Sequence, residues 1–234
     1  LHSTSRRQRQ MCIRDRFYGT VVSDGECMEY ARITGAAEAC SLLRAGEESI
    51  GQQQITFSRW RVSKDINLVA IVSNKDFATK NTLLKELNCA YDKYLNEFPE
   101  KKDRLNKIST FFAEEFSRKN IGPDYNYLLS AIFTEVVVEQ GYDGVVYPSV
   151  QASGLALNVA IKPETVDSSL RLDVVGEGRI YKNRTTTYIR SETSCIVENE
   201  KADFEYKPVK TEITIEDCLQ RVNVNSIEEL PEIK

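Results

Sequence analysis

Short apolar runs bounded by turn-forming residues predict a chain rich in β-strands. The run Val145–Tyr147 follows the turn pair Asp143–Gly144 and ends at Pro148, which lacks an N–H group and suits the end of a strand. This ending is expected to leave the hydroxyl of Ser149 at the mouth of the sheet rather than buried in it. Further strands are predicted at 17–22, 54–62, 66–72, 155–161, 170–175, 179–181 and 185–189, with a hairpin-like turn at 176–178.

The predicted strand at 54–62 changes its alternation partway along. Ile55 and Phe57 fall on one face, whereas Trp60 and Val62 have the opposite parity. The strand is therefore expected to be either bulged or covered on both of its faces.

Apolar residues at helical spacing predict three longer helices. They cover 77–98, the region around 108–116, and a stretch from a cap at Asp124 to about Glu139. Their aromatic stripes are interpreted as core rather than as a cofactor site. Two acidic residues next to these aromatics are expected to face solvent: Glu114 and Glu115.

Strands and helices intermix along 234 residues, which is long enough for one sizeable domain with a core. We expect the α+β class, with the domain at 17–198. Residues 1–16 are interpreted as a non-native segment. From about Asn199 the chain becomes charged and loses its period, so 199–234 is expected to be a peripheral tail with one short helix near 215–222.

Composition narrows the function classes. The net charge of −4 argues against a nucleic-acid-binding surface. No apolar run is long enough to span a membrane, and the first sixteen residues lack the apolar stretch of a secretory signal, so we expect a cytoplasmic protein. The six cysteines contain no C-x-x-C pair, which predicts neither a metal site nor a redox motif. The single histidine, His2, excludes a Ser-His-Asp or Cys-His mechanism.

The first sixteen residues do not resemble the rest of the chain. The stretch from Arg6 to Arg16 resembles the translation of a sequencing adapter. The alternatives are a basic arm that binds an acidic partner and a disordered tail. If the stretch is an artefact, His2 and Cys12 are not native and the genuine chain begins near Phe17.

Two polar residues are candidates for chemistry. Ser149 follows the predicted central strand, where its hydroxyl either donates to a ligand phosphate or simply caps a turn. Glu38 lies among alanines in a short helix at 36–43, which Thr34 is expected to cap. The Glu38 carboxylate either faces solvent or points into a cleft, and the pattern does not decide between these.

The chain from about 17 to 189 resembles the RES domain, a family named for an Arg, a Glu and a Ser. The most specific segments are Gly141 to Val150 (Gly-Tyr-Asp-Gly-Val-Val-Tyr-Pro-Ser-Val) and Asn158 to Pro163. The segments that also carry the resemblance are Phe17-Tyr18-Gly19, Arg32 to Arg44, Ile55 to Val72, Phe111 to Ser117 and Tyr127 to Glu135.

The resemblance implies an ADP-ribosyltransferase-like fold, a split mixed or antiparallel sheet with flanking helices and NAD in its cleft. The resemblance also implies that Glu38 and Ser149 are the catalytic residues. It implies that NAD is bound by Tyr18, Tyr147 and Ser149. Tyr18 either stacks on the nicotinamide ring or is ordinary core. The family's Arg precedes the strand of Tyr18, where the adapter-like stretch stands. Arg14 and Arg16 are not assigned its role, and these 234 residues are expected to be weak or inactive.

Three functions are compatible with these observations. The first, which RES proteins suggest, is a toxin of a toxin–antitoxin pair that cleaves the nicotinamide–ribose bond of NAD, with NAD as substrate, no metal and a cognate antitoxin as partner. A carboxylate stabilises the oxocarbenium-like ribose, and neutral nicotinamide leaves without a general acid. The second is an ADP-ribosyltransferase acting on a macromolecule, and the third is a non-catalytic NAD-binding module. Neither the acceptor, water or phosphate, nor the oligomeric state follows from the sequence.

Overall fold

A computed structural model describes residues 16–21, 28–118, 128–198 and 203–233. These residues contain seven helices and two four-stranded, mostly antiparallel sheets, so the expected α+β class is confirmed. His2, Cys12, Arg14 and the expected helix cap Asp124 lie outside the described residues.

The chain divides into two compact units. Unit 1 holds Leu1–Thr34 and Asp65–Ser169. Unit 2 holds Gly35–Lys64 and Leu170–Lys234. The residues expected to form a separate tail therefore belong to the second unit.

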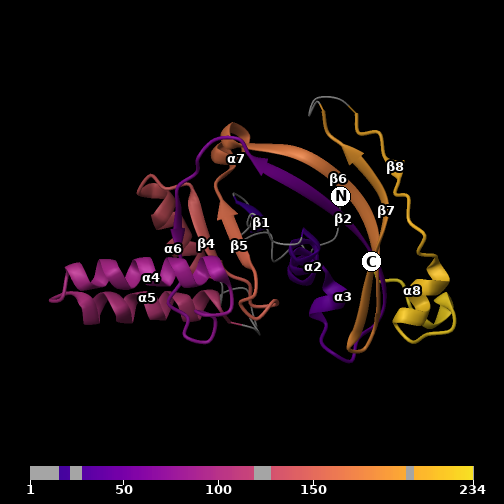
Figure 1. The fold of residues 1–234 in the computed structure, drawn as a ribbon, viewed down its shortest axis with the longest axis horizontal. Helices are drawn as coiled ribbons and strands as arrows, with labels where there is room; N and C mark the ends of the chain where they lie inside the picture. Colours follow the sequence, from indigo (N-terminus) through magenta and orange to yellow (C-terminus); the bar gives the residue numbers. More distant parts are fainter. Residues whose placement is uncertain (1–15, 22–27, 119–127, 199–202, 234) are drawn as a thin grey trace. The chain divides into compact units, whose positions relative to one another are not determined.

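Unit 1 is built on a four-stranded sheet in the order β1-β5-β4-β3 (Figure 1). β1 (Phe17–Val21) forms one edge and pairs antiparallel with β5 (Leu157–Ile161). β5 pairs antiparallel with β4 (Gly144–Pro148), and β3 (Leu68–Ala70) joins β4 in parallel at the other edge. The strands predicted around 17–22, 66–72, 145–147 and 155–161 are thus confirmed, each within a few residues.

Helices cover both faces of this sheet. α4 (Thr82–Glu97) packs on one face, where Leu84 joins Leu157 in a buried cluster. The end of α5 (Lys102–Phe116) and α6 (Leu128–Glu139) pack on the other face, where Val137 joins Val145. A shorter helix, α7, follows β5 at Pro163–Ser169.

The prediction that the aromatic stripes of these helices are core is confirmed in part: Phe116 and Phe133 pack against a buried cluster, whereas Tyr94 and Phe111 are 50% and 44% exposed. The rings of Phe112 and Phe133 have centroids 4.2 Å apart, and Phe133 also contacts Phe116 edge-on at 5.9 Å. Glu114 is exposed as expected, but the expectation for Glu115 was wrong. Glu115 is only 6% exposed, and one of its carboxylate oxygens accepts a hydrogen bond of 2.5 Å from Arg118, one helical turn later, whereas the other is buried without a hydrogen-bond partner.

Gly144 fixes the start of β4. A Cβ atom at this position would lie 2.0 Å from the carbonyl oxygen of Ala160 on the adjacent strand β5. No side chain fits at such a distance, so the glycine is required by the close approach of two backbones as well as by the turn before it.

Unit 2 holds the second sheet, in the order β2-β6-β7-β8. β2 (Ile50–Val62), β6 (Leu170–Asn183) and β7 (Thr186–Ile196) are long, curved strands, and β8 (Lys207–Pro208) is short (Figure 1). The pairing of β2 with β6 shifts register between Arg59 and Trp60, so of the two expected alternatives, a bulge or coverage on both faces, the structure shows the bulge.

The hairpin-like turn predicted at 176–178 was wrong, because β6 continues through it to Asn183. Both glycines face carbonyl groups of β7: an added Cβ would lie 3.1 Å from Thr193 O at Gly176 and 2.6 Å from Arg190 O at Gly178. The register of β6 and β7 shifts between Glu177 and Gly178. The glycines therefore permit a bulge and a close backbone approach inside a strand rather than a turn.

The helix expected at 36–43 is two helices. α2 (Met28–Ala39) runs through Thr34, which lies buried inside the helix instead of capping it. α3 (Ser41–Arg44) follows, with Cys40 at its N-cap position. Gln53 of β2 holds this junction, because its side-chain oxygen accepts hydrogen bonds from the Cys40 thiol at 2.9 Å and from the Leu42 N–H at 3.0 Å.

The C-terminal residues form a core instead of the expected periphery. α8 (Ile215–Arg221), confirmed near its predicted place, has a complete capping box between Thr214 and Asp217. A short 3₁₀ helix, η2 (Ile227–Glu229), follows. The segment 218–230 supplies five of the six residues of a buried cluster, and β6 supplies the sixth, Tyr181; the five are Cys218, Leu219, Val222, Val224 and Leu230. No helix in the described ranges is both long and apolar enough to cross a membrane.

Truncating Leu230 tests whether this segment is structural. Leu230 is 1% exposed, so Leu230→Ala is expected to reduce the free energy of unfolding by about 2–4 kcal/mol through lost burial and a cavity. The measurement is urea unfolding followed by circular dichroism. Ile215→Ala, at a site that is 43% exposed, is the matched control and is expected to cost less than about 1 kcal/mol. Equal, small effects would show that the segment is peripheral after all.

Candidate functional site

The register of the unit 1 sheet places two of the predicted NAD-contacting residues on one face. Tyr18 of β1 lies opposite Ala160 of β5, which lies opposite Val145 of β4. Tyr147 is two residues beyond Val145 on the same strand. Because alternate residues of a strand share a face, the side chains of Tyr18 and Tyr147 project from the same side of the sheet.

A buried polar pair lies on this face between the two tyrosines. Tyr147 is opposite Asn158, which is opposite Thr20. The Thr20 hydroxyl donates a hydrogen bond of 3.1 Å to the side-chain oxygen of Asn158, which is 6% exposed. Neither residue was predicted to belong to the site. The available signal was Asn158 itself, a single polar residue in the otherwise apolar strand Leu157–Ile161.

The two tyrosines have different surroundings. Tyr18 is 46% exposed, in contrast to the alternative that it belongs to the core. Tyr147 is half-buried, and its ring centroid lies 5.3 Å from that of Phe116 on α5. Tyr147 therefore takes part in the aromatic core between the sheet and the helices.

Ser149 is fully buried, with 0% exposure, contrary to the expectation that its hydroxyl stands at the mouth of the sheet. The Ser149 hydroxyl accepts a hydrogen bond of 3.1 Å from the N–H of Ala152. Its own N–H donates to Ala156 O, and its carbonyl accepts from the Gly154 N–H, both at 2.8 Å. These contacts hold the turn that joins β4 to β5, which is the turn-capping alternative that the sequence left open.

Glu38 belongs to unit 2, whereas Tyr18, Tyr147 and Ser149 belong to unit 1. On α2, the buried residue Ala36 faces the core of unit 2. Glu38 follows two residues later, about 200° further around the helix axis at 100° per residue. Its side chain is half-buried and directed away from that core.

Arg16 precedes β1 directly and has a defined partner. One of its terminal guanidinium nitrogens lies 2.5 Å from the carboxylate of Glu135 on α6, and its side chain is only 10% exposed. Arg16 was given no predicted role because it ends the adapter-like stretch. The contact joins the start of β1 to the helix that covers the same sheet.

Asp143 organises the end of the sheet opposite to Ser149. Its carboxylate accepts hydrogen bonds from the Asn67 N–H at 2.8 Å and the Thr165 hydroxyl at 2.7 Å, and it forms an ion pair with Lys162 at 3.0 Å. These interactions, led by the Asn67 N–H, lower the pKa of Asp143 from 3.8 to about 2. The network joins the entry to β3, the entry to β4 and the helix after β5.

Within the described residues, no three His, Cys, Asp or Glu side chains are grouped to hold a metal ion. The described cysteines are all free thiols: Cys40, Cys89, Cys195 and Cys218. No protein-family model, curated protein or solved structure matches the chain. The resemblance to RES domains therefore rests on the quoted residues alone.

The Asp143 network predicts a pH dependence of stability. Because folding lowers the pKa of Asp143, its ionised form stabilises the folded protein above pH 4, and this contribution is lost as the pH falls toward 2. The lost part is expected to be about 2 kcal/mol. Urea unfolding between pH 6 and pH 2 measures it. Asp143→Asn is expected to remove this part of the pH dependence, and Asp167→Asn, at an exposed position on α7, is expected to retain it. Identical pH profiles for wild type and Asp143→Asn would contradict the assignment.

Proposed function

We infer that this chain cleaves the bond between nicotinamide and ribose in NAD, as the RES-type proteins that its central segment resembles do. The observation that carries this proposal is the arrangement of that segment. It forms the paired strands β4 and β5, and Tyr18, some 130 residues earlier in the chain, projects from the same face as Tyr147.

In this proposal Tyr18 binds the nicotinamide end of NAD. Its ring is 46% exposed, and aromatic rings stack in offset geometry at a cost of little conformational freedom. The Thr20–Asn158 pair lies two residues further along the same face and offers polar atoms suited to ribose or amide groups. Tyr147 supports this face from its position against Phe116.

Ser149 is proposed to position the backbone that binds NAD rather than to contact NAD with its own hydroxyl. Its hydroxyl and backbone fix the turn 149–154, so the adjacent backbone is pre-formed for a diphosphate rather than ordered on binding. Such pre-organisation is a role for a buried serine, whereas direct donation to phosphate requires the hydroxyl to be reached by the ligand.

Glu38 is proposed as the catalytic carboxylate. The reaction breaks the C1′–N bond: the electron pair leaves with nicotinamide, which becomes neutral, and C1′ becomes an oxocarbenium-like cation. A carboxylate stabilises that cation electrostatically, and water or phosphate then forms the new bond to C1′. Neither step requires histidine, which agrees with the absence of histidine after position 2.

The test is nicotinamide release from NAD by the purified chain, with NAD binding measured separately by ligand-observed NMR. Wild type is expected to bind NAD and to release nicotinamide slowly. Glu38→Gln preserves shape and removes charge, so it is expected to lower release at least about 100-fold while NAD binding persists. Glu29→Gln, on the same helix α2, is the control and is expected to behave as wild type.

Three results would lead to other conclusions. Transfer of label from tagged NAD to a protein would favour an ADP-ribosyltransferase. Binding without release in wild type would favour a non-catalytic module. No binding of NAD at all would reject the proposal.

A further inference from the structure

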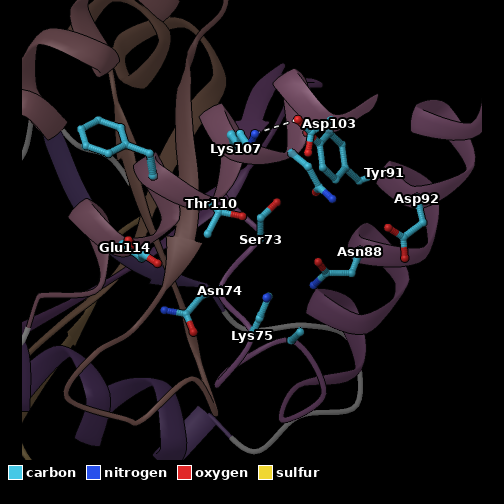
Figure 2. Close-up of a pocket in the computed structure, with 13 residues that line it drawn as sticks. Ser73, Asn74, Lys75, Asn88, Tyr91, Asp92, Asp103, Lys107, Thr110 and Glu114 are labelled. Atoms are coloured by element: carbon cyan, nitrogen blue, oxygen red, sulfur yellow. Dashed lines mark ion pairs between the residues drawn. The ribbon is translucent and has the colours of Figure 1, made fainter. Parts of the chain in front are cut away.

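A second site lies within unit 1, at the helices α4 and α5. It is a cavity of about 490 Å³ formed by three segments: the loop after β3, one face of α4 and one face of α5. In Figure 2 the side chains of Ser73 and Lys75, Asn88 and Thr110 come from these three segments and point toward a common space. None of the residues discussed for NAD lines this cavity.

The charges of the cavity do not suit a strongly anionic ligand. Its charged lining residues comprise two lysines and three carboxylates. Lys107 is already neutralised by Asp103, because the two side chains form an ion pair of 2.8 Å across one turn of α5. Lys75 shares the lining of the cavity with Asp92 and Glu114. The carboxylates of these two residues would repel a phosphate or a nucleic-acid backbone.

The cavity is lined by both hydrogen-bond donors and hydrogen-bond acceptors. Asn88 donates its amide N–H to the carbonyl of Leu84 at 2.9 Å, so its side-chain oxygen serves as the acceptor. Asn74 is used in the opposite sense: its side-chain oxygen accepts from the Asp76 N–H at 2.9 Å, so its amide group serves as the donor. A ligand hydroxyl group can both donate and accept a hydrogen bond. A ligand with several hydroxyls can therefore pair with the donors and with the acceptors of the lining.

An aromatic ring completes the lining. Phe111 of α5 is 44% exposed and contacts Phe112 only edge-on, with a centroid distance of 5.3 Å and an interplanar angle of 72°. An exposed ring beside hydrogen-bonding amides and carboxylates matches a ligand that is apolar on one face and hydroxylated around its edge. A sugar ring has this character, since its C–H bonds form an apolar face and its hydroxyls lie at the rim.

We propose that this cavity, the α4–α5 cavity, is a binding site for a neutral sugar of one or two rings. Its volume lies in the range of ligand sites and exceeds what one such ring requires. Phe111 packs against the C–H face of the sugar. Asn74, Lys75 and Thr110 donate to its hydroxyl oxygens, and Asn88, Asp92 and Glu114 accept from its hydroxyls.

The experiment is an amide chemical-shift titration of the full chain with five sugars, each added separately: glucose, galactose, mannose, N-acetylglucosamine and ribose. At least one is expected to give saturable shifts at 73–78, 88–92 and 103–114, with a Kd of about 1–10 mM. No saturable shift in these segments from any of the five up to about 50 mM would overturn the proposal.

Matched variants separate binding in the cavity from a general effect on the fold. Phe111→Ala is expected to weaken binding by about tenfold or more. Ile108→Ala, on the same helix with 45% exposure and outside the cavity, is expected to leave it unchanged. Equal affinities of the two variants would contradict the stacking role of Phe111 and with it the proposal.

Inorganic phosphate and putrescine serve as contrasting probes. The proposal predicts no saturable shift from either at the concentrations used for the sugars. Saturable binding of phosphate or of the diamine at the same residues, tighter than that of the sugars, would reassign the cavity to an anion or a cation. Because NAD is absent from these titrations and no NAD-site residue is altered, their outcome is independent of the proposed NAD cleavage.

Discussion

The Asp143 carboxylate holds together the part of unit 1 on which the candidate site depends. It receives hydrogen bonds from the Asn67 N–H and the Thr165 hydroxyl and pairs with Lys162, so the starts of β3 and β4 and the helix after β5 are fixed at one point. Gly144 directly follows, where β4 passes too close to β5 for any side chain. These two neighbours set the register of β4 against β5, and a slip of one residue would move every side chain to the opposite face.

That register also fixes which side chains share a face along the length of these strands. It determines that Tyr18 and Tyr147 share a face and that Thr20 meets Asn158 between them. The turn held by Ser149 begins where β4 ends. In the proposed NAD site the binding groups of unit 1 are therefore placed by backbone pairing, which is more rigid than placement on a loop.

Much of the fold could be predicted because its signals are local. Pro148 and Gly144 delimit β4, and the change of parity at Trp60 predicts either a bulge in β2, which the structure shows, or coverage on both faces. The errors arose where a residue's partner is distant in sequence. Gly176 and Gly178 were predicted to form a turn because the sequence does not show that carbonyl groups of β7 lie opposite them. The C-terminal segment was predicted to be peripheral because its apolar partner, Tyr181, lies far away in the sequence, in β6.

The candidate site shows the same limit. Tyr18, Tyr147 and Ser149 were selected through a resemblance, but the burial of Ser149 and the Thr20–Asn158 pair depend on strand pairing that no local pattern contains. The most direct test of the account is an amide chemical-shift titration of the chain with NAD. We predict saturable shifts at 16–21 and 147–158. Saturable shifts confined to other residues, or no shifts at millimolar NAD, would contradict the placement of an NAD site on this sheet.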